Sequence, residues 1–341
     1  MNKKAAIIIP YFGKLPQNMV TFLKSCATNP LITWFIFTDQ KFDMYKVPEN
    51  VKFIGTTFNE VKARISRAVG EQGIVLHKPY KLCDYKPTYG IAFSDYIQEY
   101  DYWGYSDIDV VYGNLWKFIH KGVEEGYDKI GDWGHFTLFK NTSSVNNRFR
   151  LPIKENGQER FLYKDAFGTK DSMQFDEIRG IDKIYEYYKY PVYRNANLMN
   201  DLLFENKDLL TNDKRFIKCP ATFIWEDGKA NFYYLGKDKK IEVQEFGYFH
   251  FHKRSFTKFI NNYDVNNFAI VTDGYYPLKE VDQQSIIEMM KLNHSSFNAR
   301  LQHLCHIYFR TNEFTDRKVL GIYLPIKYIL WRIIKEKNFA I

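Results

Sequence analysis

The sequence AAIIIP at residues 5–10 decides the fold class, because it is a continuous apolar run that ends at a proline. A run of this kind, without polar alternation, is typical of a parallel strand buried on both faces. A helical pattern follows at residues 19–27, and buried strands are predicted at residues 33–37 and 51–54. Strands that alternate with a helix predict an α/β protein with a Rossmann-like, mostly parallel central sheet.

In sheets of this class, ligands bind where the strands end at their carboxyl termini. Tyr11 directly follows the first predicted strand, and Asp39 follows the second after Thr38. We therefore expect Tyr11 and Asp39 to lie at one edge of the sheet, beside the same crevice.

Later parts of the chain show weaker patterns. A helix is predicted at residues 89–100, a long loop or excursion at residues 141–175, and strands at residues 221–225 and 232–235. From about residue 282 the apolar spacing becomes helical. The sequence thus predicts one large domain at residues 1–260, divided near residue 113, and a helical C-terminal extension at residues 261–341.

The end of the extension is basic. Residues 325–337 place isoleucines and a leucine on one helical face, with Arg332 and Lys335 opposite. An amphipathic basic helix of this kind either lies on an anionic membrane surface or packs on its own protein. No run approaches the roughly 20 apolar residues of a membrane span, so we expect a cytoplasmic protein, with the inner face of the plasma membrane as a second location.

The net charge and the cysteines indicate which kinds of ligand the protein binds. Among 341 residues, 48 Lys and Arg against 40 Asp and Glu give a net charge of +8, which favours an acidic partner such as nucleic acid, anionic lipid or a phosphorylated ligand. The four cysteines form no CxxC pair, which argues against a zinc ribbon or a disulfide framework.

Asp107 and Asp109 form the only Asp-x-Asp pair in the chain. On an extended segment, carboxylates two residues apart point to the same face. Carboxylate oxygens are hard ligands that suit Mg²⁺ or Mn²⁺ shared with substrate phosphates. The alternative is a solvated turn, but the aromatic residues before the pair and the valines after it place it beside buried strands.

A second cluster lies at residues 78–87 (KPYKLCDYKP), where Lys81, Asp84 and Lys86 are spaced between two prolines. Lysines held by a stiff backbone either bind a phosphate and orient a donor or form a basic surface loop.

A third cluster is the run from Tyr248 to Arg254 (YFHFHKR). His250 and His252 alternate on a predicted strand, so one imidazole is a candidate ligand for the same cation, while Lys253 and Arg254 are candidates for phosphate oxygens. The alternative is a structural role for both histidines.

The last candidates are Asp176 and Glu177, an acidic pair that follows the predicted excursion. A carboxylate that takes a proton from a hydroxyl acts as a general base. An exposed acidic pair without a role is the alternative.

In this order, the segments resemble a family of bacterial glycosyltransferases of capsule and O-antigen polysaccharide biosynthesis. The resemblance covers about residues 5–256, and its most specific part is the block from Trp103 to Gly113 (WGYSDIDVVYG). It implies a GT-A fold, a nucleotide-sugar donor that is most often linked to UDP, and a divalent cation, commonly Mn²⁺.

The resemblance also implies roles for single residues. Asp107 and Asp109 match the acidic metal motif, and His250 matches a late histidine that completes the metal or diphosphate site. Asp39 falls where such enzymes contact the nucleoside, and Asp176 or Glu177 falls on the acceptor side. His252 departs from the pattern, which leaves open which histidine is the ligand.

These inferences predict a metal-dependent glycosyltransferase that moves a hexosyl group of galactose, galactofuranose or glucose type from a UDP-sugar to a cell-surface polysaccharide or lipid-linked glycan. The first half of the large domain would bind the donor and the second the acceptor. Two alternatives remain at this point. A basic, aromatic-rich chain also suits a nucleic-acid-binding protein, and paired carboxylates also suit a glycoside hydrolase.

Overall fold

The computed structural model describes residues 3–70, 74–205, 208–216, 219–251 and 256–293. The chain divides into two compact units. The first comprises Met1–Met199, Phe246–His250 and Asn261–Tyr263; the second comprises Asn200–Glu245, Phe251–Ile260 and Asp264–Ile341. The chain thus crosses between the units after residues 199, 245, 250, 260 and 263, whereas the sequence predicts a single boundary at residue 260. The predicted amphipathic helix at residues 325–337 lies outside the described residues.

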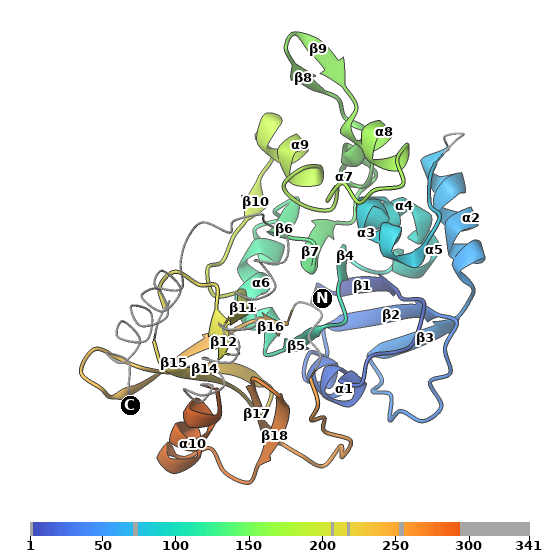
Figure 1. Cartoon of the computed structure of the whole chain (residues 1–341). Coiled ribbons are helices and arrows are strands. Elements are labelled where there is room, and N and C mark those ends of the chain that lie inside the picture. Colours follow the sequence, from blue (N-terminus) through green and yellow to red (C-terminus); the bar gives the residue numbers. More distant parts are fainter. Residues whose placement is uncertain (1–2, 71–73, 206–207, 217–218, 252–255, 294–341) are drawn as a thin grey trace, which may run out of the picture. The chain divides into compact units, whose positions relative to one another are not determined.

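A seven-stranded sheet forms the centre of the first unit, in the order β10-β6-β7-β4-β1-β2-β3 (Figure 1). Its strands are β1 (Ala5–Pro10), β2 (Ile32–Thr38), β3 (Val51–Gly55), β4 (Tyr102–Ser106), β6 (Lys129–Trp133), β7 (Phe136–Lys140) and β10 (Val192–Tyr193).

Most neighbours in this sheet are parallel. Strand β1 pairs in parallel with both β2 and β4, β2 pairs in parallel with β3, and β10 pairs in parallel with β6. Strand β7 is antiparallel to β4 and to β6. The expectation of an α/β protein with a mostly parallel central sheet is therefore confirmed, and β1, β2, β4 and β6 all end at the same edge.

Helices cover both faces of this sheet. They are α1 (Met19–Ala27), α2 (Phe58–Val69), α3 (Leu82–Tyr85), α4 (Tyr89–Ala92), α5 (Ser94–Ile97), α6 (Leu115–Glu124), α7 (Ser143–Asn146), α8 (Leu162–Phe167) and α9 (Ile181–Tyr187), with short 3₁₀ turns η1 (Pro79–Lys81), η2 (Lys86–Thr88) and η3 (Arg148–Arg150). The apolar sides of α1 and α6 join one buried cluster, and those of α2, α4, α5, α8 and α9 join a second cluster. Because both faces are covered, the strands lack polar alternation.

Two local predictions need correction. The helix predicted at residues 89–100 is broken at Phe93, whose backbone is not helical, so that α4 and α5 form separate single turns. The segment predicted as a long loop at residues 141–175 contains α7, η3, α8 and a hairpin of β8 (Ile153–Glu155) and β9 (Gln158–Arg160). These elements are too short to give a periodic signal in the sequence.

A separate antiparallel pair lies beyond the end of β4. Strand β5 (Val110–Tyr112) pairs with β16 (Tyr248–His250), and His250 is opposite Val110. Tyr112 and Tyr248 are fully buried. This pair brings residues that are far apart in the sequence to the carboxyl edge of the sheet.

The second unit contains a five-stranded antiparallel sheet in the order β15-β14-β13-β17-β18, and a hairpin of β11 with β12. The elements are β11 (Met199–Glu205), β12 (Asp208–Thr211), β13 (Ala221–Glu226), β14 (Lys229–Leu235), β15 (Ile241–Phe246), β17 (Asn267–Val271), β18 (Gly274–Leu278) and α10 (Gln283–Asn293). The apolar side of α10 packs against β13 and β17. Among the described residues, none of the helices has the length and apolar character that a membrane crossing requires.

Candidate metal and carboxylate site

The connection between β4 and β5 carries Asp107 and Asp109. The backbone bends at these residues and is not extended. The two carboxylates therefore do not lie side by side on one face of a strand. Hydrogen bonds fix the bend: the Asp107 amide donates to the carbonyl of His135 (3.2 Å), and the Ser106 hydroxyl donates to the same carbonyl (2.8 Å). The expectation of an extended pair is therefore wrong in its geometry, although the bend still brings both side chains to the carboxyl edge.

His250 lies beside this bend, at the end of β16. Its Nε2 atom is 3.7 Å from Oδ1 of Asp109. Asp107, Asp109 and His250 each offer one ligand atom, and these three atoms lie within 4.8 Å of one another. Two carboxylates and one imidazole are a donor set that suits Mn²⁺ or Mg²⁺. The structure thus brings together the three residues that the sequence suggests as metal ligands.

Lys86 connects this group to a second pair of carboxylates. Its Nζ atom donates to Oδ1 of Asp107 (2.7 Å) and to the carbonyl of Gly134 (2.8 Å), and lies 3.1 Å from Oδ2 of Asp176. Burial opposes the charged form of Lys86, but the two carboxylates raise its pKa well above the ordinary value. Burial likewise opposes ionisation of Asp107, yet Lys86 and the two neighbouring histidines lower the pKa of this carboxyl.

Asp176 and Glu177 lie on the other side of Lys86. Burial raises the pKa of Asp176 to about 7, with Lys86 acting in the opposite direction. The amide of Gly134 donates to Oε1 of Glu177 (3.0 Å). A Cβ atom on Gly134 would lie 2.4 Å from Oε1 of Glu177 and 2.5 Å from Oδ2 of Asp176, so only glycine fits here without a shift. A buried carboxyl with a pKa near neutrality is suited to proton transfer.

Lys81 and Asp84 lie in the protein interior, whereas the sequence suggests that they bind a ligand. Both side chains are fully buried and form an ion pair of 2.7 Å. Lys81 also donates to the carbonyls of Ala166 (2.7 Å) and Asp171 (2.5 Å). The Asp84 carboxylate accepts hydrogen bonds from backbone amides of residues 173 and 175 at distances of 2.9 to 3.1 Å. The pair therefore fixes the backbone that leads into Asp176.

Tyr11 and Asp39 follow β1 and β2, as the sequence suggests. Burial raises the pKa of Tyr11, and the negative charge of Asp109 raises it further. Asp39 is exposed and accepts a hydrogen bond from the side chain of Gln40 (2.8 Å). The remaining candidates, His252, Lys253 and Arg254, lie outside the described residues.

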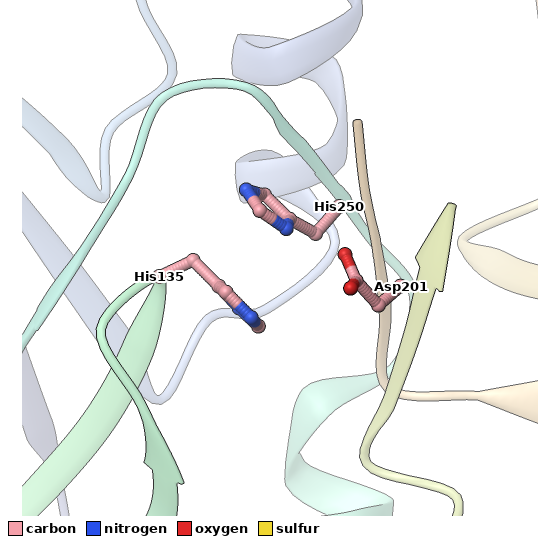
Figure 2. A group of neighbouring side chains, drawn as sticks. All are labelled: His135, Asp201 and His250. Atoms are coloured by element: carbon pink, nitrogen blue, oxygen red, sulfur yellow. The ribbon is translucent and has the colours of Figure 1, made fainter. Parts of the chain in front are cut away.

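Sequence reasoning missed His135 and Trp133. The His135 imidazole stacks on that of His250, with 4.0 Å between ring centroids and 18° between planes (Figure 2). Tyr248 Oη and His135 Nδ1 are 2.9 Å apart. The Trp133 ring lies nearly parallel to that of His135, at 9° and 5.8 Å. The signal available in the sequence was the Trp-Gly-His run between two strand patterns, since a glycine there marks a close backbone approach.

The residues that come together here belong to the first unit and meet at the carboxyl edge of its sheet; they are Asp107, Asp109, His250, Lys86, Asp176 and Glu177. A cation-ligand group, a buried ammonium and two carboxylates, one with a raised pKa, therefore lie in succession. Such an arrangement is able to hold a divalent ion and an anionic group at one end and to accept a proton at the other.

Comparison with known proteins identifies a family but no activity. Residues 7–279 match the "Family of unknown function (DUF6625)", and the chain belongs to this family. No protein with a curated description matches the sequence.

Proposed function

We propose that the protein is a metal-dependent glycosyltransferase of GT-A type, which transfers a hexosyl group from a UDP-sugar. The observation that carries this proposal is the convergence of Asp107, Asp109 and His250 within 4.8 Å, beside Lys86 and Asp176, at the carboxyl edge of a mostly parallel sheet. Nucleotide ligands of such sheets bind at this edge.

The residues present fit a divalent cation. Lys86 engages Oδ1 of Asp107, and the same carboxylate has a second oxygen, Oδ2, to offer to an ion. Asp109 and His250 add an oxygen and a nitrogen ligand, and the low pKa of Asp107 keeps its carboxylate charged. When bound, Mn²⁺ or Mg²⁺ neutralises the negative charge on a diphosphate leaving group.

The other side chains have separate roles in this proposal. Lys86 holds Asp107 in place and adds positive charge next to the diphosphate. Tyr11 and Asp39 flank the nucleoside at the ends of β1 and β2. In an inverting reaction, the acceptor oxygen forms a bond to the anomeric carbon as the bond to the phosphate oxygen breaks, and Asp176 or Glu177 takes the hydroxyl proton. In a retaining reaction that proton transfer falls to another group.

The proposed acceptor is a cell-surface polysaccharide or a lipid-linked glycan, and the proposed donor carries galactose, galactofuranose or glucose. Both rest on the resemblance of the sequence to capsule and O-antigen transferases. That resemblance also supports work at the cytoplasmic side of the plasma membrane.

The test is UDP release from a panel of UDP-hexoses, with Mn²⁺ and after EDTA treatment. We expect Mn²⁺-dependent release that falls on the order of a hundredfold in Asp109→Asn, because the ion loses a charged ligand. Glu124→Gln is the matched control, since Glu124 is an exposed carboxylate on α6. Turnover that survives both EDTA and Asp109→Asn would overturn the proposal. Metal-independent cleavage of glycosides would instead support a hydrolase.

A further inference from the structure

The side chain of Trp133 is exposed to solvent, unlike those of three other tryptophans in the chain. It is the last residue of β6 and leaves 48% of its surface accessible, whereas Trp34, Trp103 and Trp225 are buried. An exposed aromatic side chain close to polar groups is a recurrent binding element, because the apolar face of the ring can stack on a ligand.

The backbone around this ring is held in place. The carbonyl of Trp133 accepts a hydrogen bond from the Thr137 hydroxyl (2.9 Å). The next residue, Gly134, is held from both sides by Lys86 and Glu177. Nearly parallel packing on His135 restrains the indole itself. A ring fixed in advance loses little conformational entropy when a ligand stacks on it.

Trp133 also stands next to the carboxylates of the site. The space beside the Gly134 Cα atom is bounded by Oδ2 of Asp176 and Oε1 of Glu177. Trp133 and Gly134 are adjacent in the chain, so the backbone of Trp133 lies one residue from the groups that would accept a hydroxyl proton. The same turn thus carries an apolar face and contacts two proton acceptors.

We propose that Trp133 is the stacking platform for the acceptor, and that the acceptor presents a pyranose ring. A pyranose has one face of C–H groups, which pack on the aromatic ring, and a rim of hydroxyl groups, one of which would point to Asp176 or Glu177. This inference rests on the proposed function, because it assigns the acceptor subsite of the same reaction.

The test measures saccharide binding at equilibrium by ligand-observed NMR, with methyl α- and β-glucopyranoside and methyl α- and β-galactopyranoside as probes. We expect saturable binding to the full-length protein and roughly tenfold weaker binding in Trp133→Ala, with Trp133→Phe between the two. Tyr187→Ala is the matched control, because Tyr187 is an exposed aromatic residue on α9. It should bind as the unaltered protein does.

A parallel measurement separates this inference from the proposed function. The thermal shift caused by UDP with Mn²⁺ reports on the donor half and should persist in Trp133→Ala. Loss of both responses in Trp133→Ala would indicate a structural role and overturn the platform. Saccharide binding unchanged in Trp133→Ala, or no binding of any probe, would also overturn it. If no UDP response exists in the unaltered protein while Trp133 still governs saccharide binding, the transferase proposal fails and the platform stands.

Discussion

The Nζ atom of Lys86 lies 2.7 Å from Oδ1 of Asp107, and the side chain of Lys86 is almost entirely buried. The same ammonium group reaches Asp176 at 3.1 Å. One cation therefore stabilises two carboxylates that belong to different parts of the proposed site, the ion-binding end and the proton-accepting end.

Replacement of Lys86 by Met should destabilise the protein by roughly 3 kcal/mol, because a buried ionised group loses its counter-charge. The loss should be larger at pH 8 than at pH 5, since Asp176 is protonated at the lower pH and needs no cation there. Urea unfolding at both pH values measures it. Lys86→Arg, which keeps the charge, should lose less. An equal loss at both pH values would contradict this account.

Asp176→Asn should raise the melting temperature while it lowers turnover. The folded-state pKa of Asp176 is about 7, above the ordinary value of 3.8. Ionisation of this carboxyl therefore lowers the stability of the folded protein as the pH rises through that interval. An amide bears no such cost. The gain should therefore be larger at pH 8 than at pH 5, as measured by calorimetry. A gain that does not vary with pH would show that the buried carboxyl is not the cause.

Gly134→Ala should lower turnover on the order of a hundredfold, because the new methyl group displaces Asp176 and Glu177 from their positions. Gly55→Ala provides the control, since a Cβ atom there meets nothing within 4 Å and the backbone is not in the left-handed region. The measurement is Mn²⁺-dependent UDP release. Equal rates of UDP release from both variants would show that the close approach at Gly134 does not affect turnover.

Asp84→Ala should cost roughly 3–5 kcal/mol, because it leaves Lys81 charged and buried without its carboxylate partner. Lys81→Met should cost less, since Asp84 retains the backbone amides of residues 173 and 175. In the double variant the costs should be less than additive, as expected for groups in direct contact. Denaturant unfolding of all four proteins provides the comparison, and strict additivity would argue against a coupled pair.

Mn²⁺ without nucleotide should raise the melting temperature, because a ligand that binds only the folded state stabilises it by mass action. His250→Ala should weaken this response, whereas His120→Ala, a change at an exposed position on α6, should leave it intact. Equal responses in the two variants would remove His250 from the ligand set.

The first strands and helix were predictable because their signals are local. The apolar runs at β1, β2 and β3 and the helical spacing of α1 match the observed bounds within one residue at nearly every end. The sequence did not predict how β6 pairs with β7, nor the sheet of the second unit. Strand pairing depends on contacts between residues that are distant in the sequence. The break at Phe93 likewise depends on packing, and not on a proline or glycine.

The candidate site divides in the same way. Residue types and spacing singled out Asp107, Asp109 and His250, and the structure brings their ligand atoms together. Their binding of a metal stays a prediction. His135 was missed because a lone histidine has no pattern, and the buried pair of Lys81 and Asp84 could not be told from surface charges without knowing that residues 166–175 cover it.

Strand β16 has a consequence for how the protein is made. It belongs to the first unit but follows residues 200–245, which belong to the second unit. Strand β5 therefore cannot pair with β16 until those residues have left the ribosome. A nascent chain that ends near Met199 holds both aspartates of the bend but lacks the imidazole of His250. In the proposed function, the cation site is therefore completed late in biosynthesis, and fragments released early are expected to lack it.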